Sequence, residues 1–159
     1  MTDKFKTQDE LIPILNSLRK QVKKVVFTNG CFDILHVGHI RYLKEAKGYG
    51  DILIVAVNSD SSVKSIKGDK RPIVSQSERA EVVAGLEMVD YVTMFDEDTP
   101  YNLIKKLQPD VLIKGGDWTI DKIVGRDIVE ARGGKVIAIP FIEGASTTGI
   151  VERVLERYR

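Results

Sequence analysis

The chain is poor in cysteine and histidine, and its charges nearly cancel. Its 159 residues contain one cysteine, Cys31, and two histidines, and the formal net charge is +1. A single cysteine cannot form an internal disulfide, which favours a reducing compartment. A broad nucleic-acid-binding surface normally shows a clear basic excess, which this chain does not have. We therefore expect a cytoplasmic protein that does not bind nucleic acid.

Long apolar runs and the common nucleotide-binding strings are also absent. The longest purely apolar run covers residues 52–57, far less than a membrane span, and the opening MTDKFK does not begin a signal peptide. No G-x-x-x-x-G-K-[ST] string occurs and no G-x-G-x-x-G follows the first predicted strand, which argues against P-loop phosphoryl transfer and ordinary dinucleotide binding. The 43% apolar content is typical of one globular domain. We expect that domain to span residues 1–159, with a helical N-terminal extension over 1–23 and no membrane contact.

Five short apolar runs alternate with helical patterns along the chain. They cover residues 25–28, 52–58, 91–95, 111–114 and 135–139. Such alternation predicts parallel strands joined by crossover helices, that is, an α/β fold with a single Rossmann-like, doubly wound, five-stranded parallel sheet flanked by helices. The strands are apolar throughout, which fits burial on both faces.

Several helix starts are marked in the sequence. The signals are Thr7 with Glu10 and Ser75 with Glu78, both at capping-box spacing, and Thr99 as a cap before a first-turn Pro100. Pro13 should kink or shorten the first helix. A last, amphipathic helix is predicted from about Thr148.

Both histidines lie in the segment TNGCFDILHVGH, residues 28–39, which follows the first apolar run. An Asn-Gly pair at positions 29 and 30 is suited to a sharp turn that ends the strand, and the spacing soon becomes helical. A helix start offers main-chain N–H groups and a positive dipole end, which favour phosphate. His36 and His39 can face one ligand, and Gly38 lets a ligand approach the main chain.

These residues also have simpler explanations. One histidine at a helix start more often caps or packs than reacts, but two around a glycine favour a ligand site. A zinc site would need a third and a fourth ligand, and the chain has no further histidine, so we assign no protein-ligated metal. Cys31 could be a nucleophile, but no His, Asn and Asp set is arranged for it, which favours a small packing role.

Three other unusual segments also follow predicted strands: residues 58–72, rich in Lys and Ser; KGGDW at 114–118; and EGASTT at 143–148. Ligands bind beyond the carboxyl ends of the strands in open α/β sheets, so these loops and the histidine segment should form one cleft. Each has an alternative. The first could be a solvated charged loop rather than a cation-bearing lid, 146–148 a plain N-cap rather than an anion site, and Trp118 a packing residue.

The His-Val-Gly-His string at 36–39 resembles the HxGH signature of the nucleotidyltransferase superfamily. More narrowly, the chain resembles the adenylyltransferases that make ADP-heptose from D-glycero-β-D-manno-heptose 1-phosphate and ATP, found alone or as the carboxyl domain of a bifunctional heptose kinase. The matching segments are TNGCFDILHVGH, GDILIVAVNSDSSV, KGDKRP, VDYV, FDEDTP, PDVLIKGGDW and GASTT. They cover nearly the whole chain after Lys24. HxGH alone indicates only the superfamily, and KGGDW and GASTT narrow the resemblance to the ADP-heptose-forming enzymes.

The resemblance implies that the sugar 1-phosphate attacks the α-phosphorus of ATP while pyrophosphate leaves. It also implies Mg²⁺ held mainly by ATP phosphates and water, a homodimer, and a separate heptose kinase in the same pathway. The implied catalytic residues are His36, His39 and Lys67. The implied ATP and phosphate contacts are Asn29, Gly30, Cys31, Phe32, Gly38, Arg71, Arg79, Lys114, Gly115, Ser146, Thr147 and Thr148. The implied sugar-phosphate contacts are Asp33, Asn58, Asp60, Asp117 and Trp118, and no residue is assigned to a metal.

Two alternatives to this function stay open. The first is a cytidylyltransferase that acts on glycerol 3-phosphate or a similar phosphorylated polyol. These enzymes share HxGH and a terminal STT segment. They lead into it with Arg-Thr-Glu-Gly, whereas this chain has Phe-Ile-Glu-Gly at 141–144. A catalytically silent nucleotide-binding module is the other alternative, opposed by the intact histidine pair and Lys67. One departure from the adenylyltransferases is Trp118 in place of the expected Tyr, which keeps the aromatic face and removes a hydroxyl.

Overall fold

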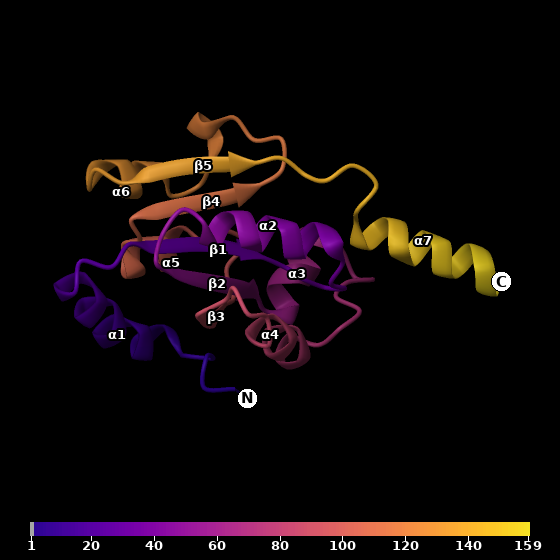
Figure 1. Ribbon diagram of the computed structural model, residues 1–159. Helices are drawn as coiled ribbons and strands as arrows, with labels where there is room; N and C mark the ends of the chain where they lie inside the picture. The colour runs from indigo at the N-terminus through magenta and orange to yellow at the C-terminus, as the bar shows by residue number, and fades with distance from the viewer. Residues whose placement is uncertain (1) are drawn as a thin grey trace.

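The computed structural model describes residues 2–159, which form one parallel sheet in the order β3-β2-β1-β4-β5 (Figure 1). The strands are β1 Val25–Gly30, β2 Ile52–Asn58, β3 Tyr91–Phe95, β4 Val111–Gly115 and β5 Lys135–Ile139. The helices are α1 Gln8–Lys20, α2 Val37–Lys47, α3 Asp60–Lys67, α4 Gln76–Ala84, α5 Tyr101–Leu107, the 3₁₀ helix η1 Ile120–Lys122, α6 Arg126–Ala131 and α7 Thr147–Tyr158. The predicted Rossmann-like α/β fold is confirmed.

The central strand β1 is longer than the sequence pattern predicts. Asn29 and Gly30 both pair in register with β2, so this pair continues the strand instead of turning it. The chain turns two residues later, where Phe32 has a φ of 49° in the left-handed region. The predicted turn at Asn29 and Gly30 is therefore wrong, because the neighbouring strand supplies hydrogen-bond partners as far as Gly30.

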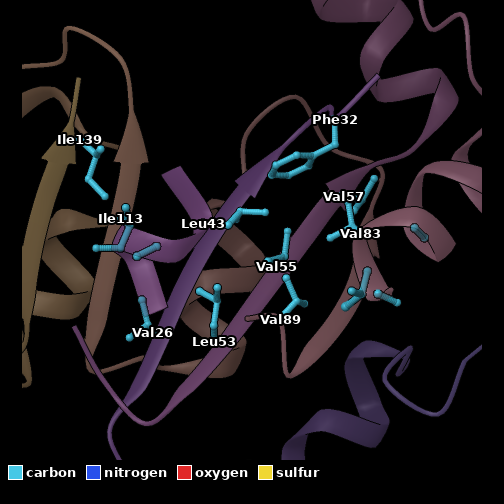
Figure 2. Packing of buried hydrophobic residues seen from close by; sticks show 14 of the residues in the cluster. Val26, Phe32, Leu43, Leu53, Val55, Val57, Val83, Val89, Ile113 and Ile139 are labelled. Atoms are coloured by element: carbon cyan, nitrogen blue, oxygen red, sulfur yellow. The ribbon is translucent and has the colours of Figure 1, made fainter. Parts of the chain in front are cut away.

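Alternate side chains of the sheet pack into two cores. On one face, α2 and α4 supply Leu43 and Val83, which pack on Val55 (Figure 2). On the other face, α1 and α5 supply Leu11 and Leu103. Burying each such side chain contributes roughly 1.5–3 kcal/mol, so both cores hold the strands firmly beneath the loops at their carboxyl ends.

The start of α1 follows its sequence signal. The Glu10 main-chain N–H donates to Thr7 Oγ1 at 3.2 Å, and the Thr7 N–H donates to Glu10 Oε2 at 2.7 Å, which confirms the capping box. The helix continues through Pro13 for 13 residues, so the proline does not shorten it. Leu11 and Leu15 are 0% exposed, and their packing on the sheet holds the helix together across the missing N–H.

The helices α4 and α5 begin without the predicted side-chain caps. Ser75 Oγ donates to the Glu78 carboxylate at 2.7 Å and makes no cap hydrogen bond, so the capping-box prediction is wrong here. The carboxylate competes successfully for the hydroxyl. Pro100 occupies the N-cap position of α5 itself, and Tyr101 is the first helical residue, so Thr99 is not the cap.

The segment 58–72, expected to be a loop, consists largely of α3. Ser59 Oγ caps this helix by accepting the Ser62 N–H at 3.2 Å, and Val63 anchors it in the core. The helix ends at Gly68, whose φ of 96° favours glycine. Only residues 68–75, which we call the α3–α4 loop, connect it to the next helix.

The last helix, α7, lies at the edge of the molecule and extends away from the sheet (Figure 1). None of its residues is buried, and Val154 and Leu155 are 50% and 46% exposed. The helix begins at Thr147, one residue before the predicted start. Between residues 2 and 159, no helix combines the length and the apolar character needed to cross a membrane.

Candidate active site

The turn between β1 and α2 places both histidines at the start of a helix. His36 is the N-cap of α2, and its Nδ1 accepts the Gly38 N–H at 3.1 Å. His39 Nδ1 accepts the His36 N–H at 3.3 Å. The two ring centroids are 4.0 Å apart. The turn therefore holds both imidazoles together through its own main chain.

These hydrogen bonds determine which ring nitrogen carries the proton. An Nδ1 that accepts a main-chain N–H is unprotonated, so each neutral ring is assigned its proton on Nε2. Burial lowers the pKa of His36, and burial together with the nearby His36 lowers the pKa of His39 to about 4. Both rings are therefore mainly neutral at pH 7, and each carries an Nε2–H that can donate to a phosphate oxygen.

The start of α7 lies against the turn between β1 and α2. We call this turn, with the first residues of α2 (residues 31–39), the histidine turn. Thr147 Oγ1 donates to the Ile34 carbonyl at 3.0 Å. A Cβ added to Gly38 would lie 3.2 Å from Ala145 Cβ and 2.8 Å from the His36 ring. Only glycine allows this close approach, which brings together two segments more than one hundred positions apart in the sequence.

The three hydroxyls of residues 146–148 have three different partners. Ser146 Oγ accepts the Gly149 N–H at 2.9 Å and is the N-cap of α7, as the simpler interpretation proposed. Thr147 binds the histidine turn. Thr148 Oγ1 accepts a hydrogen bond from Arg71 Nη2 at 3.3 Å, which connects α7 to the α3–α4 loop.

Asp33, a buried residue of the histidine turn, anchors the α3–α4 loop. Its carboxylate accepts the Ile73 N–H at 2.9 Å, the Val74 N–H at 2.9 Å and Arg71 Nη1 at 3.2 Å. A sugar hydroxyl at Asp33, as the sequence predicts, would compete with three donors already in place. The structure gives this carboxylate an internal role that a single sequence did not reveal.

Arg79 also lies behind the site rather than in it. Its side chain is 0% exposed. Nε donates to the Val74 carbonyl at 2.9 Å, and Nη1 donates to the carbonyls of Cys31 at 2.5 Å and Asn58 at 2.8 Å. Nη2 donates to Asp60 Oδ1 at 2.9 Å. The guanidinium is thus committed to protein acceptors, whereas the sequence suggested a phosphate contact.

The KGGDW segment holds a cation over an aromatic ring. Lys114 Nζ lies 5.3 Å from the centroid of the Trp118 ring, and Trp118 is 46% exposed. Burial lowers the pKa of Lys114, and the positive charge of Lys67 lowers it further. Gly116, with a φ of 113°, packs closely against the Phe141 ring. The positive charge of Lys67 therefore opposes that of Lys114 in the free protein.

Cys31, the residue after β1, is a free and partly buried cysteine. Burial raises the pKa of its thiol, although the positive charges of Lys67, Arg79 and Lys114 oppose the rise. A thiol with a raised pKa is mostly protonated at pH 7 and is a poor nucleophile. The hydrogen bonds of Arg71 and Thr147 join the histidine turn, the α3–α4 loop and the start of α7, and Gly115 of the KGGDW segment packs against Tyr42 of α2, so the four predicted loops lie near one another.

Other predicted contacts occupy supporting positions. Asn58 is 2% exposed, and its Nδ2 donates to Ser62 Oγ at 3.0 Å. The Phe32 side chain is 5% exposed and belongs to the core, with its ring centroid 5.3 Å from that of His39. Asn29 and Gly30 lie in β1. Any ligand contact from Phe32 would have to come from its main chain.

Tyr42 is a supporting residue that the sequence analysis did not identify. Its hydroxyl pairs with Thr28 Oγ1, and a Cβ on Gly115 would lie 3.2 Å from its ring. The side chain therefore fixes the end of β4 against the start of the histidine segment. A tyrosine among the apolar positions of α2 was the available signal, because a buried hydroxyl needs a partner.

A cavity of about 540 Å³ lies beside the α3–α4 loop. It is lined by Asp60, Ser61, Lys64, Asp69, Arg71, Pro72, Ile73 and Ser75. Carboxylates, hydroxyls and cations together suit a ligand that carries both a phosphate and hydroxyl groups. The cavity follows β2, whereas Lys114 lies near the end of β4 and Trp118 follows that strand, on the other side of the central strand.

Comparisons with known proteins found a matching family and several relatives. Residues 27–153 match the family described as cytidylyltransferase-like. The chain is 52% identical to the bifunctional protein HldE of Geobacter sulfurreducens over 98% of its own length, and 55% identical to that of Nitratiruptor sp. over 96%. It spans only 32% of the length of each of these two relatives.

Two solved structures share the fold. The lipopolysaccharide core biosynthesis protein from Thermoplasma volcanium is 31% identical, with a TM-score of 0.66, and the match covers 76% of this chain and 99% of that one. The pantoate-β-alanine ligase from Francisella tularensis is 18% identical, with a TM-score of 0.61 and coverage of 96% and 77%. The second likeness shows the fold alone.

Proposed function

The chain belongs to the cytidylyltransferase-like family of nucleotidyltransferases, and from this we propose that it transfers AMP from ATP to D-glycero-β-D-manno-heptose 1-phosphate. The products would be ADP-heptose and pyrophosphate, for lipopolysaccharide core or related surface-glycan synthesis. The observation that carries nucleotidyl transfer is the pair of neutral imidazoles, protonated at Nε2, beside the start of α7. This arrangement offers donors where a polyphosphate would lie.

The choice of ATP and a heptose phosphate is supported by the relatives and by the matching segments. Two HldE proteins are more than 50% identical to nearly the whole chain, and the Thermoplasma neighbour is named for lipopolysaccharide core synthesis. The KGGDW and GASTT segments, which narrow the resemblance to ADP-heptose-forming enzymes, both border the histidine turn in the structure.

In the proposed reaction, a phosphate oxygen of the sugar 1-phosphate attacks the α-phosphorus of ATP. The bond from that phosphorus to the oxygen bridging to the β-phosphate breaks, and pyrophosphate leaves. No protein nucleophile is needed, in keeping with the protonated Cys31 thiol. Negative charge grows on the transferring group, and the Nε2–H donors of His36 and His39 would stabilise it without reorganisation.

The cations would bind the triphosphate. Lys67 and Lys114 repel each other in the free protein, and a polyphosphate between them would relieve that repulsion. Arg71 would add a third positive charge, and the start of α7 at residues 146–148 would hold the β- and γ-phosphates. We assign the nucleoside to the region of Lys114 and Gly115.

We place the sugar phosphate in the cavity beside the α3–α4 loop. Asp60 is the predicted sugar contact that lines this cavity, and Lys64 supplies positive charge for the phosphate of the sugar. Asp117 and Trp118 are exposed on the other side of the histidine turn, where they would close over the same substrates. The transferring phosphorus would then lie between the cavity and the KGGDW segment, beside the two histidines.

Magnesium would be bound through the substrate. Among the described residues, no three His, Cys, Asp or Glu side chains are grouped so as to hold a metal ion. We infer that Mg²⁺ would be held mainly by phosphate oxygens and water, as the ion prefers. When bound, Mg²⁺ would neutralise charge on the leaving pyrophosphate.

Further features of the proposal concern the protein's surroundings. We infer that it acts in the cytoplasm as a homodimer and receives its sugar phosphate from a separate heptose kinase. The relatives it matches are about three times longer and are named bifunctional, which supports a second activity in the same pathway. The exposed apolar side chains of α7, including Val154 and Leu155, would suit contact with a second copy.

Cytidylyl transfer to glycerol 3-phosphate, or to a similar phosphorylated polyol, is the second candidate, and the description of the matching family favours it. The lead into the STT segment argues against it, because Phe141 stands where those enzymes carry arginine. Its side chain packs against Gly116 instead.

Pyrophosphate release with ATP and with CTP, each paired with heptose 1-phosphate and with glycerol 3-phosphate, separates the candidates. We expect turnover with ATP and the heptose phosphate only. A preference for CTP and glycerol 3-phosphate would support cytidylyl transfer. ATP binding seen in the fluorescence of Trp118, the only tryptophan, without turnover of any pair would indicate a silent module.

A further inference from the structure

Arg79 is the largest side chain among the fully buried residues, although it carries a permanent charge. Burying a charged group is costly unless it is paired and hydrogen-bonded. Here one carboxylate and three carbonyls meet that requirement, so the charge is satisfied entirely by the protein. A buried arginine with these partners, directly behind a catalytic turn, calls for a role other than contact with substrate.

Two of its partners are the ends of the two central strands. Nη1 donates to the carbonyl of Cys31, the first residue after β1, and to that of Asn58, the last residue of β2. One guanidinium nitrogen therefore joins the ends of both strands. The histidine turn is thus fixed to the strand that leads into α3.

A third partner is the root of the α3–α4 loop. Nε donates to the Val74 carbonyl, while Asp33 accepts the N–H groups of Ile73 and Val74 from the other side. The main chain at 73–74 is therefore held by a cation on one side and an anion on the other. The position of Arg71, two residues before Ile73, depends on these hydrogen bonds.

The fourth partner is Asp60, whose Oδ1 accepts from Nη2 at 2.9 Å. The Asp60 side chain is 45% exposed and lines the cavity that we assign to the sugar phosphate. The same guanidinium therefore orients a cavity carboxylate, the histidine turn and the loop that carries Arg71.

We propose that Arg79 is a positioning residue for nucleotidyl transfer, which aligns the histidine turn with the acceptor cavity without touching either substrate. The kinetic part of this inference rests on the proposed function; the positional part does not. Misplacing reacting groups by about 1 Å can cost about a hundredfold in rate, so a partner of this kind can matter for turnover.

Arg79→Lys tests the proposal, because lysine keeps the charge but cannot reach four acceptors in three directions. Arg19→Lys is the matched control. Arg19 also donates to main-chain carbonyls, those of Leu107 at 2.5 Å and Gln108 at 3.0 Å, but at the opposite end of the sheet. The first measurement is amide hydrogen exchange, which needs no substrate and no activity.

We expect Arg79→Lys to speed exchange in residues 31–39 and 71–75 and Arg19→Lys to leave both segments unchanged. Kinetics follow: kcat for Arg79→Lys should fall by about tenfold or more, while ATP affinity from Trp118 fluorescence changes by less than about threefold. Unchanged exchange in a folded Arg79→Lys protein overturns the proposal. So does a kcat within about twofold of wild type, or an equal loss in Arg19→Lys.

Asp33→Asn is the second variant, in case lysine at position 79 prevents folding. It weakens the grip on residues 73–74 from the other side and should speed exchange in 71–75 in the same way. If neither variant alters that segment, Arg79 and Asp33 do not position it. An inactive wild-type protein would remove the proposed reaction and leave the exchange result to decide the positional role.

Discussion

His36 and His39 lie with their ring centroids 4.0 Å apart, and the Nδ1 of each ring accepts a main-chain N–H from the same turn. A protonated ring could not accept that hydrogen bond. The turn therefore favours neutral rings through its geometry, in the same direction as burial does. Donors that are neutral bind a ground-state phosphate modestly and gain strength as charge develops, which is the differential binding that catalysis requires.

Substitution of His39 should separate the roles of its two nitrogens. His39→Ala is expected to fold normally and to lower turnover by about 10²–10³-fold, because one preorganised donor is lost. Glutamine places an amide N–H near the position of Nε2, and asparagine near that of Nδ1. We expect Gln to retain more activity than Asn in steady-state pyrophosphate release, and wild-type turnover of the Ala variant would falsify the assignment.

Stability should fall in mild acid because of the same ring. The pKa of His39 is about 4 in the folded protein and 6.5 for an ordinary histidine, so the unfolded chain binds more protons between these values. The stability from neutral His39 is complete above pH 6.5 and is lost as the pH falls towards 4, and the lowered pKa of His36 acts in the same sense. Urea unfolding of His39→Gln should show a weaker pH dependence than wild type across this window. An identical slope would contradict the shift.

Lys114 should strengthen ATP binding and lower the stability of the free protein. Burial lowers the pKa of its ammonium, and the positive charge of Lys67 acts in the same direction. Lys114→Met is expected to raise the melting temperature of the free protein and to weaken ATP binding by about tenfold, because a charged hydrogen bond to phosphate is lost. Lys105→Met, at an exposed position of α5, is the control and should change neither quantity. Calorimetry and nucleotide titration measure both, and a lower melting temperature for Lys114→Met would contradict the prediction.

Gly38→Ala should lower turnover strongly and stability only slightly. A Cβ there would meet the His36 ring at 2.8 Å and Ala145 Cβ at 3.2 Å, so the ring or the start of α7 must move. We expect turnover to fall by about tenfold or more with a stability loss of only about 1 kcal/mol. Gly48→Ala, at the other end of α2 with a φ of −62°, is the matched control and should keep wild-type kinetics. Equal kinetics for the two variants would show that the close approach at Gly38 is unimportant.

The strands were predictable because parallel strands buried on both faces need continuous apolar runs, and all five runs are strands in the structure. Local signals decided less where tertiary partners compete. Asn29 and Gly30 favour a turn in isolation, but β2 offers them hydrogen bonds. The Ser- and Lys-rich sequence of α3 hides a helix that is stabilised by its cap and by burial of Val63.

The sequence predicted which loops form the candidate site better than it predicted what each residue in those loops does. The HxGH spacing and the position of each loop after a strand are local features, and they predicted which loops lie together. Whether a charged side chain faces the cleft depends on residues far away in the sequence. Arg79 and Asp33 resemble ligand contacts in the sequence, but carbonyls and amides of distant segments bind them first.

The main chain of the α3–α4 loop is held at residues 73–74 by Asp33 and Arg79 before any ligand arrives. Substrates would then be enclosed by movements of side chains rather than of the main chain of this loop. Crystals of the free protein should accordingly tolerate soaking with nucleotide without cracking, and solution scattering should give nearly the same radius of gyration with and without ATP.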